Sequence, residues 1–182
     1  TGVLPDGRTR FAGGTGLDRA DYGARVSALA VTLDGAPNDG AKNEKDDIEK
    51  DVEVVVGGAG ADKVVGSPAD DTLYGGPGND TLDGRNGADT LDGGDGDDLV
   101  KGGPGRDTLD GNDGADELVG GPDTDTQRGG PGTDVLKTKD RVDEIVDCGT
   151  GVDEARPDGP PKKPHGDLVT GDALAGCEDV KA

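Results

Sequence analysis

The sequence predicts an all-β protein whose short strands stack in parallel into a solenoid. Three observations support this: an unbroken nine-residue repeat, glycine and aspartate at fixed places, and an aliphatic residue near the end of almost every unit. From residue 57 to residue 137 the chain reads GGAGADKVV, GSPADDTLY, GGPGNDTLD, GRNGADTLD, GGDGDDLVK, GGPGRDTLD, GNDGADELV, GGPDTDTQR, GGPGTDVLK. The first place is always glycine, the sixth is always aspartate, and the eighth is aliphatic in eight of nine units.

Each unit is predicted to contain a tight turn followed by a short strand. Glycines at the first, second and fourth places are expected to adopt left-handed backbone conformations that residues with a Cβ avoid. The last three residues, such as Thr81-Leu82-Asp83, alternate polar, apolar and polar, as in a strand with one inward side chain. Two units then make an 18-residue coil, with equivalent turns of successive coils about 4.8 Å apart.

The eighth-place residues are predicted to form a thin core between two sheets. They are Val64, Leu73, Leu82, Leu91, Val100, Leu109, Leu118 and Leu136, with the amide of Gln127 as the exception. Burying each one contributes about 1.5–3 kcal/mol, which is too little to order the whole repeat region without metal. A flexible acidic linker with Asp-Gly turns is the alternative, but a linker does not require this apolar place.

The sixth-place aspartates are predicted to form two columns, one at each edge of the solenoid. One column contains Asp62, Asp80, Asp98, Asp116 and Asp134, and the other contains Asp71, Asp89, Asp107 and Asp125. Carboxylates this close repel one another unless a cation lies between them. Carboxylate and carbonyl oxygens on a flexible backbone suit Ca²⁺ better than Mg²⁺, and the chain has no cluster of cysteines or histidines for zinc.

The units match the pattern G-G-x-G-x-D-x-U-x, so the chain resembles the hemolysin-type calcium-binding repeat proteins of the RTX class. The resemblance implies a parallel β-roll (a β-solenoid) in which each ion lies between the carboxylates of two stacked turns and also binds backbone carbonyls. The glycines that it implies near the metal are Gly58, Gly60, Gly76, Gly78, Gly87, Gly94, Gly96, Gly103, Gly105 and Gly114. Four gaps in one column and three in the other predict about seven calcium ions. These would partly neutralise the net charge of −21.

Residues 1–56 are predicted to form an N-terminal cap. They contain one further calcium-type turn, Gly13–Asp18, with Asp18 as a candidate ligand, and two predicted strands, Val26–Leu33 and Val52–Val56. The acidic segment between the strands is predicted to be a solvated loop that caps the roll, with an additional calcium site as the alternative. Its candidate ligands are Asp34, Asn38, Asp39, Glu44, Asp46 and Asp47.

Residues 138–182 are predicted to form a C-terminal cap. Cys148–Asp153 keeps the turn pattern with cysteine in the first place, and a Pro-rich loop follows. The only two cysteines, Cys148 and Cys177, suggest a disulfide and an oxidising compartment. The family resemblance favours the same pairing. A catalytic thiol is the alternative, but the single histidine, His165, lies in the Pro-rich loop.

The composition excludes several classes of function. Strong acidity argues against nucleic acids and anionic membrane surfaces as partners, and no apolar run is long enough to span a membrane. No basic region followed by an apolar run begins the chain, so any signal peptide is expected to have been removed or to lie outside it. Ser27 and Ser67 are outside any nucleophile elbow. We therefore expect no enzymatic activity.

The sequence thus predicts a secreted protein that folds on binding extracellular calcium and serves as a structural or export-linked module, with calcium as its partner. One alternative is the non-catalytic part of a larger secreted hydrolase with an upstream catalytic domain. Another is an adhesion or ice-binding module at the cell surface that uses an outward ladder of Thr72, Thr90, Thr108 and Thr126, although β-propensity also explains that ladder. The turn Gly120–Asp125, in which Asp123 replaces a glycine, is predicted to be the weakest site.

Overall fold

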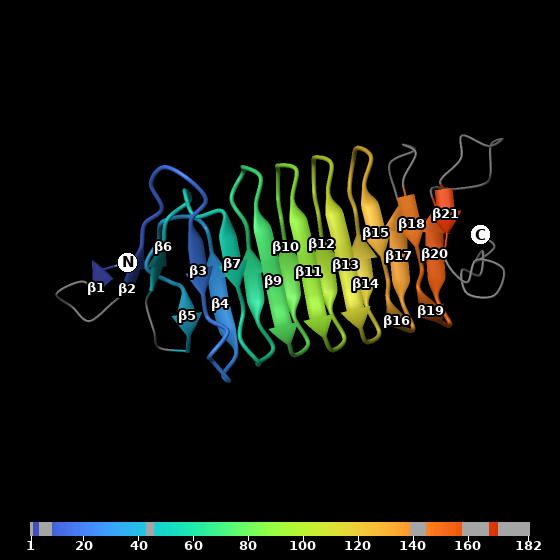
Figure 1. Cartoon of the computed structure of the whole chain (residues 1–182), viewed down its shortest axis with the longest axis horizontal. Helices are drawn as coiled ribbons and strands as arrows, with labels where there is room; N and C mark the ends of the chain where they lie inside the picture. The colour runs from blue at the N-terminus through green and yellow to red at the C-terminus, as the bar shows by residue number, and fades with distance from the viewer. Residues whose placement is uncertain (1, 4–8, 43–45, 139–144, 158–167, 171–182) are drawn as a thin grey trace.

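The computed structural model describes residues 2–3, 9–42, 46–138, 145–157 and 168–170. These residues form strands and turns, with no helix among them. Figure 1 shows the strands side by side in an elongated stack, with the N-terminal elements at one end and the C-terminal elements at the other. The prediction of an all-β, parallel β-roll is therefore confirmed.

Two eight-stranded sheets form the stack, and the chain alternates between them. The first sheet contains, in spatial order, β5 (Gly40–Ala41), β4 (Leu29–Thr32), β8 (Lys63–Val65), β10 (Thr81–Asp83), β12 (Leu99–Lys101), β14 (Glu117–Val119), β17 (Val135–Thr138) and β20 (Glu154–Pro157). The second contains β3 (Arg19–Asp21), β7 (Val54–Val56), β9 (Thr72–Pro77), β11 (Thr90–Asp95), β13 (Thr108–Asp113), β15 (Thr126–Arg128), β18 (Ile145–Asp147) and β21 (Leu168–Thr170).

Pairing between neighbouring strands is parallel throughout both sheets, except between β4 and β5. Thr90 pairs with Thr108 and Leu82 pairs with Val100, so equivalent residues of neighbouring coils are 18 apart. This register confirms the predicted coil of two units.

In the repeats, the core lies between the two sheets and is built from the eighth-place side chain of each unit. The eight predicted aliphatic side chains are all buried, with at most 1 % of their surface exposed. Gln127 takes the same inward position and is also fully buried, and its Nε2 donates to Lys137 O at 3.3 Å. The period of nine therefore identifies the core correctly, including its one polar member.

The boundary between strand and turn differs from the prediction at one edge of the roll. β9, β11 and β13 contain six residues each, because pairing continues into the first three places of the following unit. Gly76 pairs with Gly94, and Pro77 pairs with Asp95. The hydrogen-bond ladder therefore continues around the corner at this edge.

The N-terminal end has a broader core than the repeats. β1 (Gly2–Val3), β2 (Thr9–Phe11) and β6 (Asp47–Ile48) form a small three-stranded sheet beside the roll. Tyr22, Leu33 and Ile48 are buried there, and the rings of Phe11 and Tyr22 are 5.7 Å apart between centroids. These side chains close the N-terminal end of the roll.

Both predicted N-terminal strands start later than expected. β4 begins at Leu29, and Val26 is 81 % exposed. The reason is that the segment before Leu29 covers the first repeat turn, where Arg25 O accepts a hydrogen bond from the Ala59 amide. The second predicted strand begins at Val54, because the Glu53 and Val54 amides both donate to Asp18 O.

The sheets continue beyond both ends of the nine-residue repeat. β3, β4 and β7 precede it, and β18, β20 and β21 follow it. The short strands β16 (Pro131–Gly132) and β19 (Thr150–Gly151) also pair in parallel. The division at residues 57 and 137 therefore marks where the sequence repeat starts and stops. His165 and Cys177 lie outside the described residues, so the predicted disulfide stays a prediction.

Candidate metal centre

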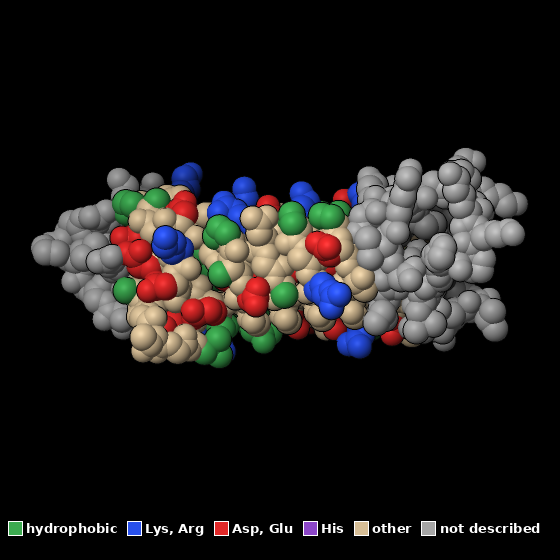
Figure 2. Space-filling view, turned by 90° about the horizontal axis from the view of Figure 1, so that it is seen from above, with side chains coloured by type: hydrophobic (Ala, Val, Ile, Leu, Met, Phe, Trp, Pro, Cys, Tyr) green, Lys and Arg blue, Asp and Glu red, His purple; other side chains and the backbone are tan. Residues whose placement is uncertain are grey.

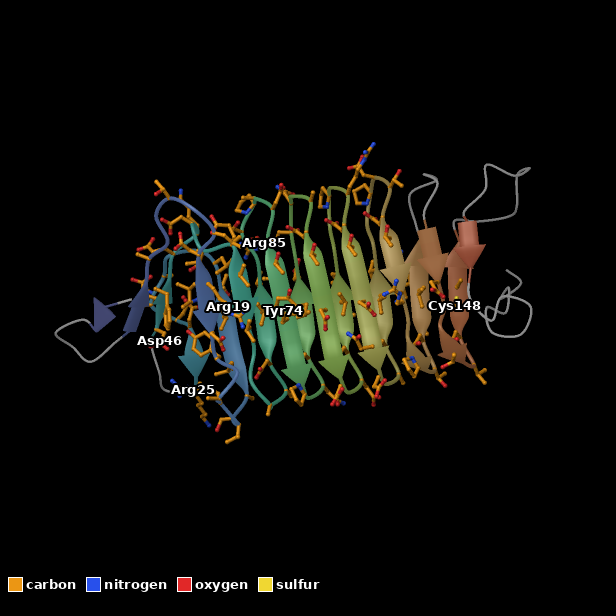
Figure 3. All side chains as sticks on the ribbon, in the orientation of Figure 1. Arg19, Arg25, Asp46, Tyr74, Arg85 and Cys148 are labelled. Atoms are coloured by element: carbon orange, nitrogen blue, oxygen red, sulfur yellow. The ribbon has the colours of Figure 1, made fainter. Side chains whose placement is uncertain are left out.

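The sixth-place aspartates stand in two columns at opposite edges of the roll. We name them the Asp62 column (Asp62, Asp80, Asp98, Asp116, Asp134) and the Asp71 column (Asp71, Asp89, Asp107, Asp125). In Figure 3, Arg85 marks the edge of the Asp71 column, and Arg25 lies at the opposite edge, beside the first turn of the Asp62 column. All nine carboxylate side chains are buried, with at most 3 % of the residue surface exposed.

Backbone hydrogen bonds hold one oxygen of each carboxylate in place. The amide of one sixth-place aspartate donates to Oδ1 of the aspartate in the next coil, as from Asp80 to Asp98 at 2.7 Å. The same bond, at 2.7–2.9 Å, joins Asp62 to Asp80, Asp98 to Asp116, Asp116 to Asp134, Asp71 to Asp89, Asp89 to Asp107 and Asp107 to Asp125. Each carboxylate therefore lies between two coils.

The second carboxylate oxygen has no such partner in most of these turns. The Oδ2 atoms in question are buried and accept no hydrogen bond; they belong to Asp80, Asp89, Asp98, Asp107, Asp116 and Asp134. A buried carboxylate oxygen without a hydrogen bond or a counter-charge is costly. A row of such atoms fits a site for a hard cation, since oxygen is the ligand that Ca²⁺ prefers.

The pKa values of these aspartates also show that their negative charges are not compensated within the protein. Burial raises the pKa of Asp89, Asp98 and Asp134 to about 7, and neighbouring carboxylates add to the effect. Burial also raises the pKa of Asp80, Asp107 and Asp116 to about 6. In each case the amide bond from the preceding coil partly opposes the rise. The protein alone therefore disfavours the charged form of these groups, and a bound cation would favour it.

Backbone carbonyls face the same gaps between coils. A Cβ placed on Gly94 would lie 2.1 Å from Gly76 O, and one placed on Gly96 would lie 1.8 Å from Gly78 O. The carbonyls of the second and fourth places thus point at the next coil. Among the described residues, no three acidic, histidine or cysteine side chains converge on one point. A cation in a gap must therefore take much of its coordination from the main chain.

The glycines of a unit serve two different purposes. Second- and fourth-place glycines from Gly76 onward, with the exception of Gly132, have left-handed backbones, for example Gly76 at φ +102° and Gly96 at φ +132°. First-place glycines do not, so the prediction was wrong for that place. Glycine is required at the first place because other atoms lie too close for a side chain. A Cβ on Gly75 would lie 2.4 Å from Gly93 O and 2.5 Å from Asp80 Oδ2. Any side chain there would displace the carboxylate.

Comparison with known families agrees with this geometry. Residues 56–91, 92–127 and 101–136 match the family model of the RTX calcium-binding nonapeptide repeat (4 copies). This segment belongs to the RTX repeat family. The chain therefore contains a calcium-binding β-roll module. No curated protein matches the chain.

The first two RTX turns differ from the later ones. The turns Gly57–Asp62 and Gly66–Asp71 contain no left-handed residue, contrary to the expectation for Gly58 and Gly60. Asp62 Oδ2 accepts from the Gly58 amide at 2.6 Å, and Asp71 Oδ2 accepts from the Ser67 amide at 2.6 Å. In these two turns the backbone itself satisfies the oxygen that is unpaired in the later repeats.

Both columns extend beyond the RTX repeats. Asp153 Oδ1 accepts from the Asp134 amide at 3.0 Å, and Asp153 Oδ2 is buried without a partner. Sequence reasoning recognised the Cys148–Asp153 turn but did not place Asp153 in a column, because the spacing from Asp134 is 19 residues. In the other column, Glu53 Oε2 accepts from the Asp18 amide at 2.8 Å. Counting back one unit from Asp62 would have found Glu53.

The N-terminal acidic loop uses its carboxylates for structure. Both oxygens of the buried Asp39 accept backbone hydrogen bonds, from Thr32 at 2.6 Å and from Ile48 at 2.9 Å. The Tyr22 hydroxyl donates to Asp46 Oδ2 at 3.4 Å. Glu44 lies outside the described residues. These bonds favour the capping role that was predicted for the loop.

One face of the module carries mixed side chains. Figure 2 shows acidic and basic groups interspersed on one face, with apolar side chains scattered between them. Among the residues that the structure describes, there is no helix with the length and apolarity needed to cross a membrane.

Proposed function

We propose that this protein is a secreted module whose β-roll completes its folding when it binds extracellular calcium. The observation that carries the proposal is the row of buried, unpaired carboxylate oxygens in both columns. Burying such groups without compensation opposes folding. Calcium would supply the missing positive charge and would join successive coils. Ca²⁺ sites with dissociation constants of about 10⁻⁴–10⁻³ M are typical of extracellular modules.

The proposed ligands are the sixth-place aspartates together with backbone carbonyls from the glycine-rich places. Asp80 and Asp98, with the carbonyls of Gly76 and Gly78, illustrate one such gap. About seven ions are proposed from the gaps within the two columns, and Asp153 adds one more gap to the Asp62 column. Asp18 is proposed as a ligand at the N-terminal end of the other column, beside Glu53.

A calcium titration followed by circular dichroism tests the proposal. The β signal should rise with calcium, and EGTA should reverse the change. Isothermal titration calorimetry on the same samples should give several ions per chain. Magnesium at the same concentration is the matched control, because its small octahedral shell suits this irregular site poorly. An equal β signal in EGTA and in calcium, or only one or two ions bound, would refute the proposal.

Two further parts complete the proposal, and the second of them has its own test. The module itself is proposed to be non-catalytic, since its aspartates are used in columns. Cys148, which is buried, is proposed to form a disulfide with Cys177. Intact mass before and after alkylation, with and without reductant, decides this: protection of both thiols from alkylation supports the bridge. Alkylation of the unreduced protein under denaturing conditions would contradict it.

One surface observation favours a second candidate function. Thr72, Thr90, Thr108 and Thr126 lie in register on the second sheet. Such a rank of hydroxyls could bind ice or a sugar as an adhesion surface. The adjacent rank includes Tyr74, Asp92 and Arg128, so it is neither flat nor uniform. Replacing Thr90 and Thr108 with Lys should abolish ice or glycan binding and leave calcium binding intact. Retained binding would remove this candidate.

A further inference from the structure

The roll contains two regions that satisfy their buried carboxylates differently. Before residue 75, the carboxylates of Asp39, Asp62 and Asp71 have both oxygens hydrogen-bonded within the protein. The donors to Asp62 are the Leu29 and Gly58 amides, and those to Asp71 are the Ser67 amide and hydroxyl. Asp18 keeps an unpaired oxygen, but its residue is only partly buried. From Asp80 onward, unpaired buried oxygens recur in both columns.

Backbone conformation changes at the same point. No described residue between Gly40 and Gly76 has a left-handed φ. From Gly76 onward every repeat turn contains one, and Arg85, Asn112 and Asp123 adopt this conformation despite having a Cβ. A left-handed conformation costs about 1–2 kcal/mol for a residue with a Cβ. The three turns that contain these residues therefore carry a conformational cost that the turns Gly57–Asp62 and Gly66–Asp71 do not carry.

Apolar burial is also concentrated before residue 75. Larger side chains such as Tyr22, Leu29, Leu33 and Ile48 supplement the inward residues of the strands there. In the repeats that follow, each strand contributes a single inward side chain to the core. Since apolar burial is the main favourable contribution to folding, the N-terminal coils have a source of stability that does not depend on metal.

We infer that the described residues between Phe11 and Tyr74 (11–42 and 46–74) form a calcium-independent nucleus, onto which the coils from Gly75 onward assemble only when calcium is bound. This inference rests on the proposed function, because it divides the proposed calcium-dependent folding between two parts of one chain. The nucleus presents the edges of β8 and β9 to the coil that follows, so the repeats need not nucleate a β-roll unaided. In a repeat protein, adding a repeat to a folded neighbour costs less free energy than nucleating the first folded repeat.

Hydrogen–deuterium exchange of the full chain, measured by mass spectrometry in calcium and in EGTA, tests the inference. In EGTA, peptides within residues 11–74 should keep their protection, and peptides within residues 75–137 should exchange like unfolded chain. In calcium, both regions should be protected. Loss of protection in both regions in EGTA would overturn the nucleus but leave calcium-dependent folding standing. Equal protection of both regions in EGTA would overturn both proposals.

A matched pair of core variants separates the two regions. Leu33 and Leu109 are both buried leucines, one in the proposed nucleus and one in the calcium-dependent coils. In EGTA, Leu33→Ala should reduce protection within residues 11–74 by about 30-fold or more, and Leu109→Ala should leave that protection unchanged. If Leu109→Ala reduced it as much as Leu33→Ala did, the nucleus would extend into the repeats and the inference would be wrong.

Discussion

Replacing Asp98 with asparagine tests the carboxylate columns at their centre. Asp98 Oδ1 accepts from the Asp80 amide at 2.7 Å, and its own amide donates to Asp116 at 2.8 Å, so Asp98 borders two gaps. Asn keeps the size of the side chain and one acceptor oxygen but removes the charge. We expect the loss of about two calcium ions from the stoichiometry, because two gaps each lose a charged ligand. At calcium concentrations about 100-fold above Kd, each lost ion removes about 2.7 kcal/mol of stability.

Calorimetric titration and thermal unfolding in calcium measure this effect. Asp97→Asn is the matched control: Asp97 is the adjacent residue, its side chain is exposed, and its Oδ1 accepts from the Ala115 amide at 3.0 Å. That variant makes the same change of charge outside the column and should bind as many ions as the wild type. Equal stoichiometry and stability for the two variants would refute the reasoning that buried column carboxylates bind the metal.

Three further outcomes are expected. Gly96→Ala should lower the thermal midpoint in saturating calcium, because its Cβ would lie 1.8 Å from Gly78 O at φ +132°; an unchanged midpoint would contradict the close approach. Asp123→Gly should stabilise the calcium-bound roll by about 1 kcal/mol, measured by denaturant unfolding, since Asp123 has φ +86°. Acidification from pH 7.5 to pH 5 in EGTA should increase the β signal. The pKa values of Asp89 and Asp98 in the folded protein are raised to about 7, so the folded state binds more protons than the unfolded state in this range. The stability of the folded state therefore increases as pH falls. A β signal that falls with pH would contradict this sign.

The nine-residue period was enough to predict the coil length, the sheet pairing and the core. Its success extends to Gln127, because an inward place is set by register and not by polarity. Sequence reasoning failed where the period breaks. The late start of β4 depends on Arg25 O and the Ala59 amide, a contact between segments that share no repeat.

The candidate site was predictable in outline only. The columns follow from the stacking of identical units, so their membership could be read from the spacing. Asp153 is displaced by a single inserted residue, and Glu53 is a different residue type. The distinct chemistry of the first two turns was also not predicted, since Gly58 and Gly60 occupy the same places of the repeat as later glycines and differ from them in backbone conformation.

The alternation of the chain between two sheets has a consequence for how such a protein can change in length. Because each coil uses 18 residues and the two halves of a coil face opposite sides, duplication or deletion of a whole coil leaves both ends and both outer faces in place. Gain or loss of a single unit would instead exchange the two sides for everything downstream, so that Thr108 and Lys101 would trade surfaces. The length of this roll should therefore evolve, and can be engineered, in steps of two units. Such steps change the length along the roll axis and leave the two end segments unchanged.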